Sequence, residues 1–467
     1  MKPGRAIVPL LLAACASVGS AQPGTSNRPS CPVKSGSTQP LTYPRPSDFY
    51  AVQYQVGGGG WTDACVYISY YGETDASPYR GDSGYTVGKT SLSFVSIPAR
   101  ADTIVQLRVT KLVGTPFQPG DHVSVRPSVK MMDVETQNDG TVQVSTATGS
   151  GFMGEQFLLW WNRDTDGGGV ESLAFFLDPP YTRPAGASVK VITTPGDLNG
   201  DLSSFDTLDF EGPVAIGTTG ALAFRVPHNI LNIFLGTGAW VQGKLRFDLA
   251  DTDSTGTNKT RRLYGPGVLD VSRFSYENRA SSGDDGYYAL SSSVTNDLDH
   301  YHIDGIVITD LNHAANDILY NSTVNNMKTL GWNGENAALR LGDGTTASNI
   351  FIRSGDDSLM MWGTSVTVTE ATVWQNYNGG VVNLGWSYNS KGNYNLVDGL
   401  YVVKTDWLIP TDPSWDAISP PGPPSPLNGQ NNAVFASLMV PGTMYGKVQP
   451  RCTETSSWKI LRECCSA

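Results

Sequence analysis

Short apolar runs recur through the second half of the chain at nearly constant intervals. They begin at Ile306, Met327, Ile350, Val373 and Leu400, with spacings of 21, 23, 23 and 27 residues. Each run is only a few residues long and is followed by polar or small residues, so it has the length of a strand. Such a recurrence, about every 20–25 residues, is typical of a parallel β-helix or a leucine-rich solenoid. The leucine-rich consensus is absent, which favours the β-helix.

The first half of the chain has a different pattern, typical of a β-sandwich. Between residues 49 and 195, short alternating runs such as Ala51–Val56 and Thr103–Val109 are separated by turn signals about every ten residues. The 51 glycines and the low share of charged residues, 16%, fit frequent turns and half-buried strands. We therefore expect an all-β protein with an amino-terminal β-sandwich (49–195) and a right-handed, pectin-lyase-like parallel β-helix (196–450).

The segment Pro195–Asp201 marks the predicted boundary between the two parts. Its Asp-x-Asn-x-Asp spacing is that of a calcium loop, but Leu202 replaces the glycine that such a loop needs. We interpret the segment as a turn-rich linker. Residues 451–467 contain three cysteines and no β-helix run, and we expect them to form an atypical tail.

The amino terminus predicts secretion. Two basic residues precede an apolar stretch, and small residues follow as far as Ala21, which is the pattern of a signal peptide over residues 1–21. A leader rich in Pro, Ser and Thr occupies 22–48. Secretion permits the modifications that the sequence predicts, a Cys31–Cys65 disulfide and glycosylation at Asn258 and Asn321.

The charge of the chain bears on its partners. The formal net charge is −11 and no Lys/Arg cluster is present, so a nucleic-acid partner is not expected. After the signal peptide, no segment reaches the ~20 apolar residues of a membrane-spanning helix. A neutral polysaccharide fits better, and we expect a secreted monomer without cofactor or metal.

The most pointed candidate for chemistry is an aspartate pair. Asp356 and Asp357 lie in the segment Ser354–Ser358, directly after the predicted strand Asn349–Arg353. Glycoside hydrolysis needs one carboxylic acid to protonate the leaving oxygen and a second carboxylate to activate water. An exposed Asp-Asp turn without catalytic function is the other interpretation of the same pattern.

The coil around this pair resembles a known family. The segment Asn349–Trp362 is similar to the pair-bearing coil of glycoside hydrolase family 49, the dextranase and isopullulanase family, and more distantly to that of the polygalacturonases. Asn383–Ser387 is similar to the next coil of that family. The resemblance implies that Asp356 is the general acid, that Asp357 helps to activate water, and that the anomeric centre is inverted. It also implies endo-hydrolysis of an α-glucan, with α-1,6 linkages of dextran as the target.

Two positions depart from the family pattern. Ala337 stands where the family has a third aspartate, and Met360 stands where it commonly has a lysine. Three interpretations remain open. Asp357 acts alone; or Glu335, about one coil before Asp356, supplies the missing carboxylate; or the chain is a catalytically impaired carbohydrate-binding protein.

Aromatic residues on the flanking coils are candidates for sugar stacking. We assign substrate binding to Trp386, Trp362, Tyr377 and Trp332. Trp374 lies inside an apolar run, and we interpret it as a core residue.

Overall fold

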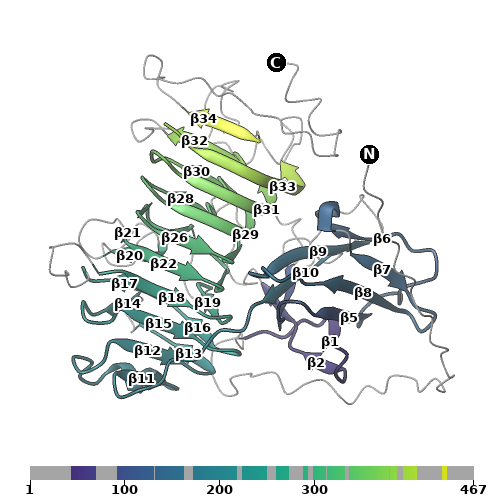
Figure 1. Cartoon of the computed structure of the whole chain (residues 1–467), viewed down its shortest axis with the longest axis horizontal. Coiled ribbons are helices and arrows are strands. Elements are labelled where there is room, and N and C mark those ends of the chain that lie inside the picture. The colour runs from purple at the N-terminus through teal and green to yellow at the C-terminus, as the bar shows by residue number, and fades with distance from the viewer. Residues whose placement is uncertain are drawn as a thin grey trace, which may run out of the picture.

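The computed structural model consists almost entirely of β-strands (Figure 1). It describes residues 44–69, 92–130, 132–161, 172–217, 223–249, 259–272, 288–292, 298–311, 313–331, 336–377, 379–386, 393–407 and 434–438. Within these ranges, two short 3-10 helices, η1 (Ser128–Lys130) and η3 (Pro195–Leu198), interrupt the strands. None of the helices in these ranges has the length and hydropathy needed to cross a bilayer.

The amino-terminal part is a sandwich of two five-stranded sheets. The first sheet has the order β2 (Thr62–Ala64), β1 (Tyr50–Val56), β5 (Ile104–Lys111), β8 (Thr141–Ala147) and β7 (Asp133–Thr136). The second has the order β3 (Tyr67–Ser69), β4 (Leu92–Pro98), β10 (Ser172–Asp178), β9 (Glu155–Trp161) and β6 (Val123–Arg126). Alternate residues of β5, such as Val105 and Leu107, are fully buried between the sheets, as the alternation of the sequence predicts.

The remainder is a parallel β-helix, so the expected fold class is confirmed. The largest sheet has two arms that meet at β29 (Thr346–Ser354). One arm comprises β11 (Val189–Ile192), β12 (Thr207–Phe210), β15 (Asn232–Leu235), β18 (Arg261–Tyr264), β22 (Tyr301–Asp304) and β26 (Thr323–Asn325). The other comprises β13 (Pro213–Ala215), β16 (Trp240–Gln242), β19 (Val268–Asp270), β23 (Val307–Thr309) and β27 (Lys328–Leu330). Beyond β29 follow β31 (Thr367–Tyr377) and β33 (Leu396–Trp407).

Two further parallel sheets complete the coils. The four-stranded sheet comprises β14 (Ala223–Val226), β17 (Lys244–Phe247), β20 (Tyr288–Ser292) and β24 (Ala314–Asn316). The six-stranded sheet comprises β21 (Leu298–Asp299), β25 (Leu319–Tyr320), β28 (Leu339–Leu341), β30 (Leu359–Met361), β32 (Val382–Trp386) and β34 (Phe435–Leu438). Figure 1 shows the coils stacked from β11 to β34, with the sandwich beside them.

The register of the coils agrees with the repeat in the sequence except at one position. Val307 pairs with Lys328, and Lys328 pairs with Phe351, so the first two spacings of 21 and 23 residues are confirmed. In the next coil the partner of Ile350 is Ala371, which also pairs with Leu400. The predicted alignment of Val373 with Ile350 was therefore wrong by two residues. A shift of two residues leaves the same side chains of the strand facing the core.

The solenoid begins earlier than the predicted boundary. Strand β11 pairs in parallel with β12, so Val189–Ile192 belongs to the first coil rather than to the sandwich. Pro195–Asp201 is a turn within this coil. The carboxylate of Asp197 accepts hydrogen bonds from the backbone N–H groups of Thr193 (2.9 Å) and Thr194 (2.8 Å).

An apolar layer joins the sandwich to the solenoid. The sheet that contains β10 is buried on both faces: Phe175 faces the sandwich core and Phe176 faces the solenoid. Phe176 packs against Phe351, and Trp160 packs against Trp374, with ring centroids 5.3 and 5.7 Å apart. The solenoid residues of this layer come from successive coils: Trp240, Val268, Val307, Leu330, Phe351, Trp374 and Val403.

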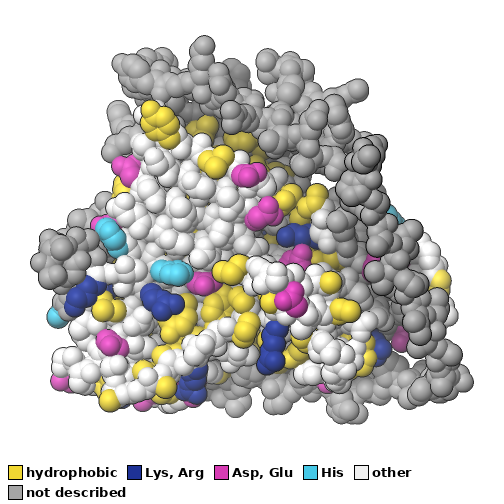
Figure 2. All heavy atoms as spheres, in the orientation of Figure 1, with side chains coloured by type: hydrophobic (Ala, Val, Ile, Leu, Met, Phe, Trp, Pro, Cys, Tyr) yellow, Lys and Arg dark blue, Asp and Glu magenta, His cyan; other side chains and the backbone are white. Residues whose placement is uncertain are grey.

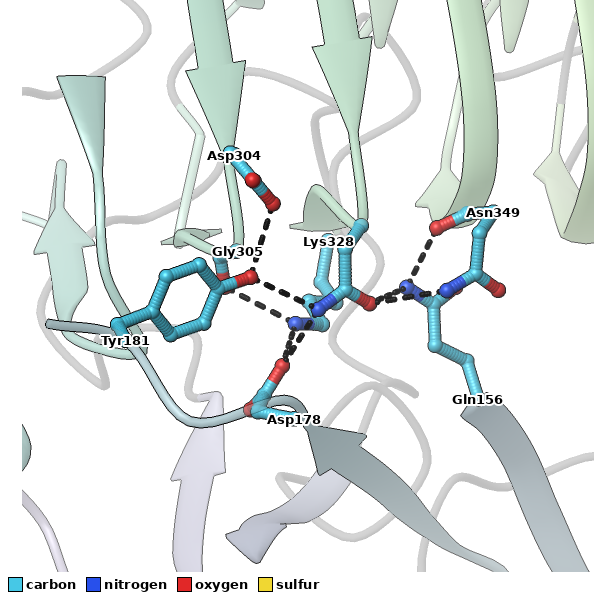
Figure 3. A network of polar contacts seen from close by, with 8 residues as sticks. Gln156, Asp178, Tyr181, Asp304, Gly305, Lys328 and Asn349 are labelled. Carbon is cyan, nitrogen blue, oxygen red and sulfur yellow. Dashed lines mark hydrogen bonds and ion pairs between the residues drawn. The ribbon is translucent and has the colours of Figure 1, made fainter. Parts of the chain in front are cut away.

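A buried ion pair lies in the same interface (Figure 3). Lys328 donates to the carboxylate of Asp178, at the end of β10, and to the carbonyl oxygen of Gly305 (2.9 Å). Burial raises the pKa of Asp178 and lowers that of Lys328, and the charge of each partner opposes the shift of the other.

Neutral side chains extend this network on both sides. The hydroxyl of Tyr181 donates to Asp304 (2.8 Å), and Gln156 donates to the carbonyl oxygen of Asn349 (2.7 Å). Asn326 donates to Asp178 (2.8 Å) and to Tyr181 (3.1 Å). The interface therefore combines apolar packing with hydrogen bonds that fix its alignment.

Candidate active site

The aspartate pair lies in the turn between β29 and β30. Backbone N–H groups of Gly355 and Asp356 donate to the carbonyl oxygen of Asn336 in the preceding coil, at 3.1 and 2.9 Å. From the following coil, Gln375 donates to the carbonyl oxygen of Asp356 (2.8 Å). Asn336 and Gln375 are fully buried, so the turn is held from both neighbouring coils.

Two serines add hydrogen bonds within the turn and to the following coil. The hydroxyl of Ser354 donates to the carbonyl oxygen of Asp356 (2.9 Å), and the hydroxyl of Ser358 donates to Oε1 of Gln375 (2.5 Å). The two hydroxyl oxygens lie 2.7 Å apart. Satisfied hydrogen bonds of this kind give a site one preferred geometry.

Asp357 is the more buried member of the pair, with 6% of its surface exposed. Its Oδ1 accepts the backbone N–H of Gly380 (2.7 Å), and its Oδ2 accepts the side-chain N–H of Asn383 (2.5 Å). Burial raises the pKa of Asp357, while these two hydrogen bonds and the positive charge of Arg340 act in the opposite direction.

Asp356 is half-buried, and its Oδ1 accepts the backbone N–H of Asp357 (2.8 Å). Gly379 packs directly against both residues. A Cβ at position 379 would lie 2.5 Å from the backbone nitrogen of Asp357 and 2.6 Å from Oδ1 of Asp356. The φ of Gly379 is +77°, so both space and backbone conformation require glycine.

The two positions that depart from the family pattern lie in an apolar cluster beside the pair. Ala337 and Met360 are buried with Ala314 and Trp362. Ala337 precedes Ala338, whose backbone N–H donates to the carbonyl oxygen of Asp357 (2.9 Å). The cluster therefore contains both positions at which the sequence is expected to depart from the family pattern.

The predicted sugar-binding residues are placed unequally. Trp362 is 7% exposed, and the guanidinium of Arg340 lies 4.5 Å from the centre of its ring, so one face of this ring is occupied. The backbones of Tyr377 and Trp386 lie in β31 and β32, both in the coil after the pair, but their side chains are outside the description. Glu335 and Trp332 lie outside the described residues. All four aromatic assignments, and the assignment of Glu335, stay predictions.

The described residues test only some of the remaining sequence predictions. Trp374 is fully buried, so its interpretation as a core residue is confirmed. Cys65 forms a disulfide bond, and its predicted partner Cys31 is outside the described residues. Asn321 is exposed, whereas Asn258, residues 1–43 and the tail 451–467 are not described. Within the described ranges, no group of three or more His, Cys, Asp or Glu side chains could hold a metal ion.

Comparison with known proteins adds a family relationship. Two dextranases, from Arthrobacter sp. (strain CB-8) and Arthrobacter globiformis, are each 22% identical to this chain over 378 residues. The chain resembles the family 49 dextranases. The alignments cover 70% of this chain and only 57% of each Arthrobacter dextranase. No protein-family model matches the chain.

A solved dextranase structure supports the same fold. Dex49A from Penicillium minioluteum superposes with a TM-score of 0.58 and 15% identity, over 79% of this chain and 76% of Dex49A. The similarity to the dextranases extends across most of this chain, and the resemblance expected from the pair-bearing coil is confirmed.

Proposed function

We propose that this protein is a glycoside hydrolase that cleaves α-glucan chains within the polymer, with the α-1,6 linkages of dextran as its substrate. The observation that carries the proposal is the pair Asp356–Asp357, held by hydrogen bonds from both neighbouring coils in a chain that resembles dextranases. Two adjacent carboxyl groups held in one turn provide the acid and the base that hydrolysis of a glycosidic bond requires.

The two carboxyl groups have different surroundings and different assigned roles. Both oxygens of Asp357 accept N–H groups, which offsets part of the rise in its pKa that burial causes. On the family resemblance, we assign Asp357 as the base that activates water. Asp356 is less buried than Asp357, and on the family resemblance we assign it as the general acid. Water then attacks the anomeric carbon as the protonated leaving group departs, with inversion and without a covalent intermediate. Glu335 remains the second candidate for the base.

A neutral polysaccharide suits the surface of the molecule. On the face drawn in Figure 2, acidic and basic side chains are interspersed, and the described residues there form no broad patch of one sign.

Because a long glucan cannot enter a cell, we also propose that the protein is secreted, and that it acts as a monomer.

The test is the release of reducing sugar from dextran, pullulan, starch and arabinan. We expect release from dextran, and a loss of about 10²-fold or more in Asp356→Asn and Asp357→Asn, the size typical of losing an acid or base. Asp63→Asn, at an exposed site on the sandwich, is the matched control and should leave the rate unchanged. Proton NMR of the first product should show the inverted anomer. Retention of configuration, or full activity in both variants, would contradict the assignment.

One observation favours a second function. Ala337 and Met360 form part of an apolar cluster beside Asp357, so a carboxylate and a cation of the family pattern are replaced there. A carbohydrate-binding protein without catalysis would bind dextran in isothermal titration yet release no sugar from any member of the panel.

A further inference from the structure

Asn383 holds one oxygen of the Asp357 carboxylate. Its Nδ2 donates to Oδ2 of Asp357 at 2.5 Å, and only 1% of Asn383 is exposed. Val382 and Leu384, its neighbours in β32, pack against the solenoid core. Because side chains alternate along a strand, Asn383 points to the outer face of its sheet. Since β32 pairs with β30, the contact joins two successive coils.

The other end of the Asn383 amide is also occupied. Its Oδ1 accepts the backbone N–H of Gly385 at 2.9 Å. Because the carbonyl end of the amide accepts this N–H group, the amino end faces Asp357. A buried amide that is satisfied at both ends has one preferred orientation.

A β-bulge follows Asn383 in the same strand. Asn383 pairs with Ala436, and Trp386 pairs with Leu438, so three steps along β32 oppose two steps along β34. Bulges bend a strand, change the direction of the residues that follow, and are frequent beside active sites. The N–H group of Gly385, which Asn383 accepts, lies inside this bulge. Trp386, which the sequence predicts to stack on sugar, comes directly after it.

We propose that Asn383 is a positioning residue that couples the orientation of the Asp357 carboxylate to the bulge that leads to Trp386. The backbone N–H of Gly380 already holds Oδ1 of Asp357, so the bond from Asn383 removes the remaining freedom of rotation. The orientation of the carboxylate toward an incoming water is thereby set. The inference rests on the proposed function, because it takes Asp357 as the base and Trp386 as a sugar-binding residue. Asn383 acts through these two residues.

Asn383→Asp separates the two contacts. It has the shape of the wild-type side chain and keeps an acceptor for Gly385, but it places a second carboxyl group against Asp357. Two carboxyl groups at hydrogen-bond distance share a proton, which raises the pKa at which the second one ionises. The acidic limb of the kcat/KM profile should therefore move to higher pH by about one unit or more, with recovery as the pH rises. Asp356 and Arg340, the other charged groups described near Asp357, are unchanged.

Asn383→Ala removes both contacts. It should lower kcat by about 10²-fold, because a displacement near 1 Å has that effect. It should also raise KM, because the bulge loses its acceptor, whereas Asn383→Asp should keep the KM of the wild type above the limb. Asn229→Asp is the matched control. The Asn229 amide donates to the carbonyl oxygens of Leu202 (2.9 Å) and Phe205 (2.7 Å) on an early coil, so neither the limb nor KM should change.

The outcomes distinguish this inference from the proposed function. An unmoved limb in Asn383→Asp, or a KM raised equally in both variants, would show a purely structural role and overturn the inference. If the wild-type protein releases no sugar, the proposed function fails, but crystal structures of wild type and Asn383→Ala still test the positioning. We expect the Asp357 carboxylate to rotate and residues 384–386 to shift in the variant; an unchanged carboxylate and bulge would refute the coupling. Asn383→Asp keeps the acceptor within the bulge, so it carries the test where the alanine variant does not fold.

Discussion

Replacement of Gly379 by alanine should damage the site and the stability of the protein together. Gly379 has a φ of +77°, and its missing Cβ would lie 2.5 Å from the backbone nitrogen of Asp357. It would also lie 2.8 Å from the backbone carbon of Asp356. Both neighbours are backbone atoms of a turn held from both adjacent coils, so they cannot move aside without breaking hydrogen bonds.

The magnitude follows from two separable contributions. The left-handed backbone costs an alanine about 1–2 kcal/mol. Forced overpacking adds about 1–3 kcal/mol. Gly212 supplies the matched control, because its φ is +66° and a Cβ there meets nothing within 4 Å. We therefore expect a loss of about 2–5 kcal/mol in the free energy of unfolding for Gly379→Ala, and about 1–2 kcal/mol for Gly212→Ala.

Urea unfolding and dextran hydrolysis measure the two effects. Gly379→Ala should lower kcat/KM by about 10²-fold, because a displacement near 1 Å of an acid or base has that effect. Gly212→Ala should retain the rate of the wild type. Equal destabilisation of the two variants, with hydrolysis intact in both, would refute the reasoning that the turn is rigid.

Two predictions concern the interface between the sandwich and the solenoid. Lys328→Met leaves Asp178 buried without its partner and should cost about 3–5 kcal/mol of stability at pH 7. The cost should be smaller at pH 5, because burial raises the pKa of Asp178 and protonation then removes the unpaired charge. Equal losses at both pH values in urea unfolding would contradict this. Tyr181→Phe removes hydrogen bonds to Asp304 and Asn326 and should cost about 1–3 kcal/mol, measured by the same assay, with hydrolysis unchanged. An unaltered stability would show that water replaces the hydroxyl.

The coil repeat could be predicted because each coil buries the same short strand face. The error at Val373 has a simple cause. Ala371 is the register partner of Ile350, but a single alanine after Glu370 is a weak apolar signal, whereas Val373 is a strong one. Both residues face the core, so the pattern of burial could not distinguish them. The early start of the solenoid at β11 was hidden because Pro195–Asp201, a turn inside the first coil, has the composition of a linker.

The aspartate pair could be found because two adjacent carboxylates stand in the turn that follows a predicted strand. Gln375 and Asn383 could not, because their hydrogen bonds to the pair depend on how coils of unequal length stack. Asn383 is 26 residues from Asp357 in sequence, and Gln375 is 19 from Asp356. The pair of Lys328 and Asp178 joins residues 150 apart. Lys328 stacks between the apolar residues Val307 and Phe351, and a charged residue in that place was the only indication of a buried ion pair. Its partner, Asp178, lies in the other half of the chain.

The apolar layer between the two parts changes how the solenoid resists disruption. In a simple stack each coil contacts only its neighbours, so coils can detach one by one from an end. Here the sandwich contacts strands from β16 to β33. Separating any one coil therefore also breaks its contacts with the apolar layer of the sandwich, which the other coils share. Phe176 packs against β29, the strand that leads into the aspartate turn, and Trp160 packs against β31, the strand that contains Gln375. The sandwich thus supports the strands beside the aspartate turn from the opposite side and limits their movement.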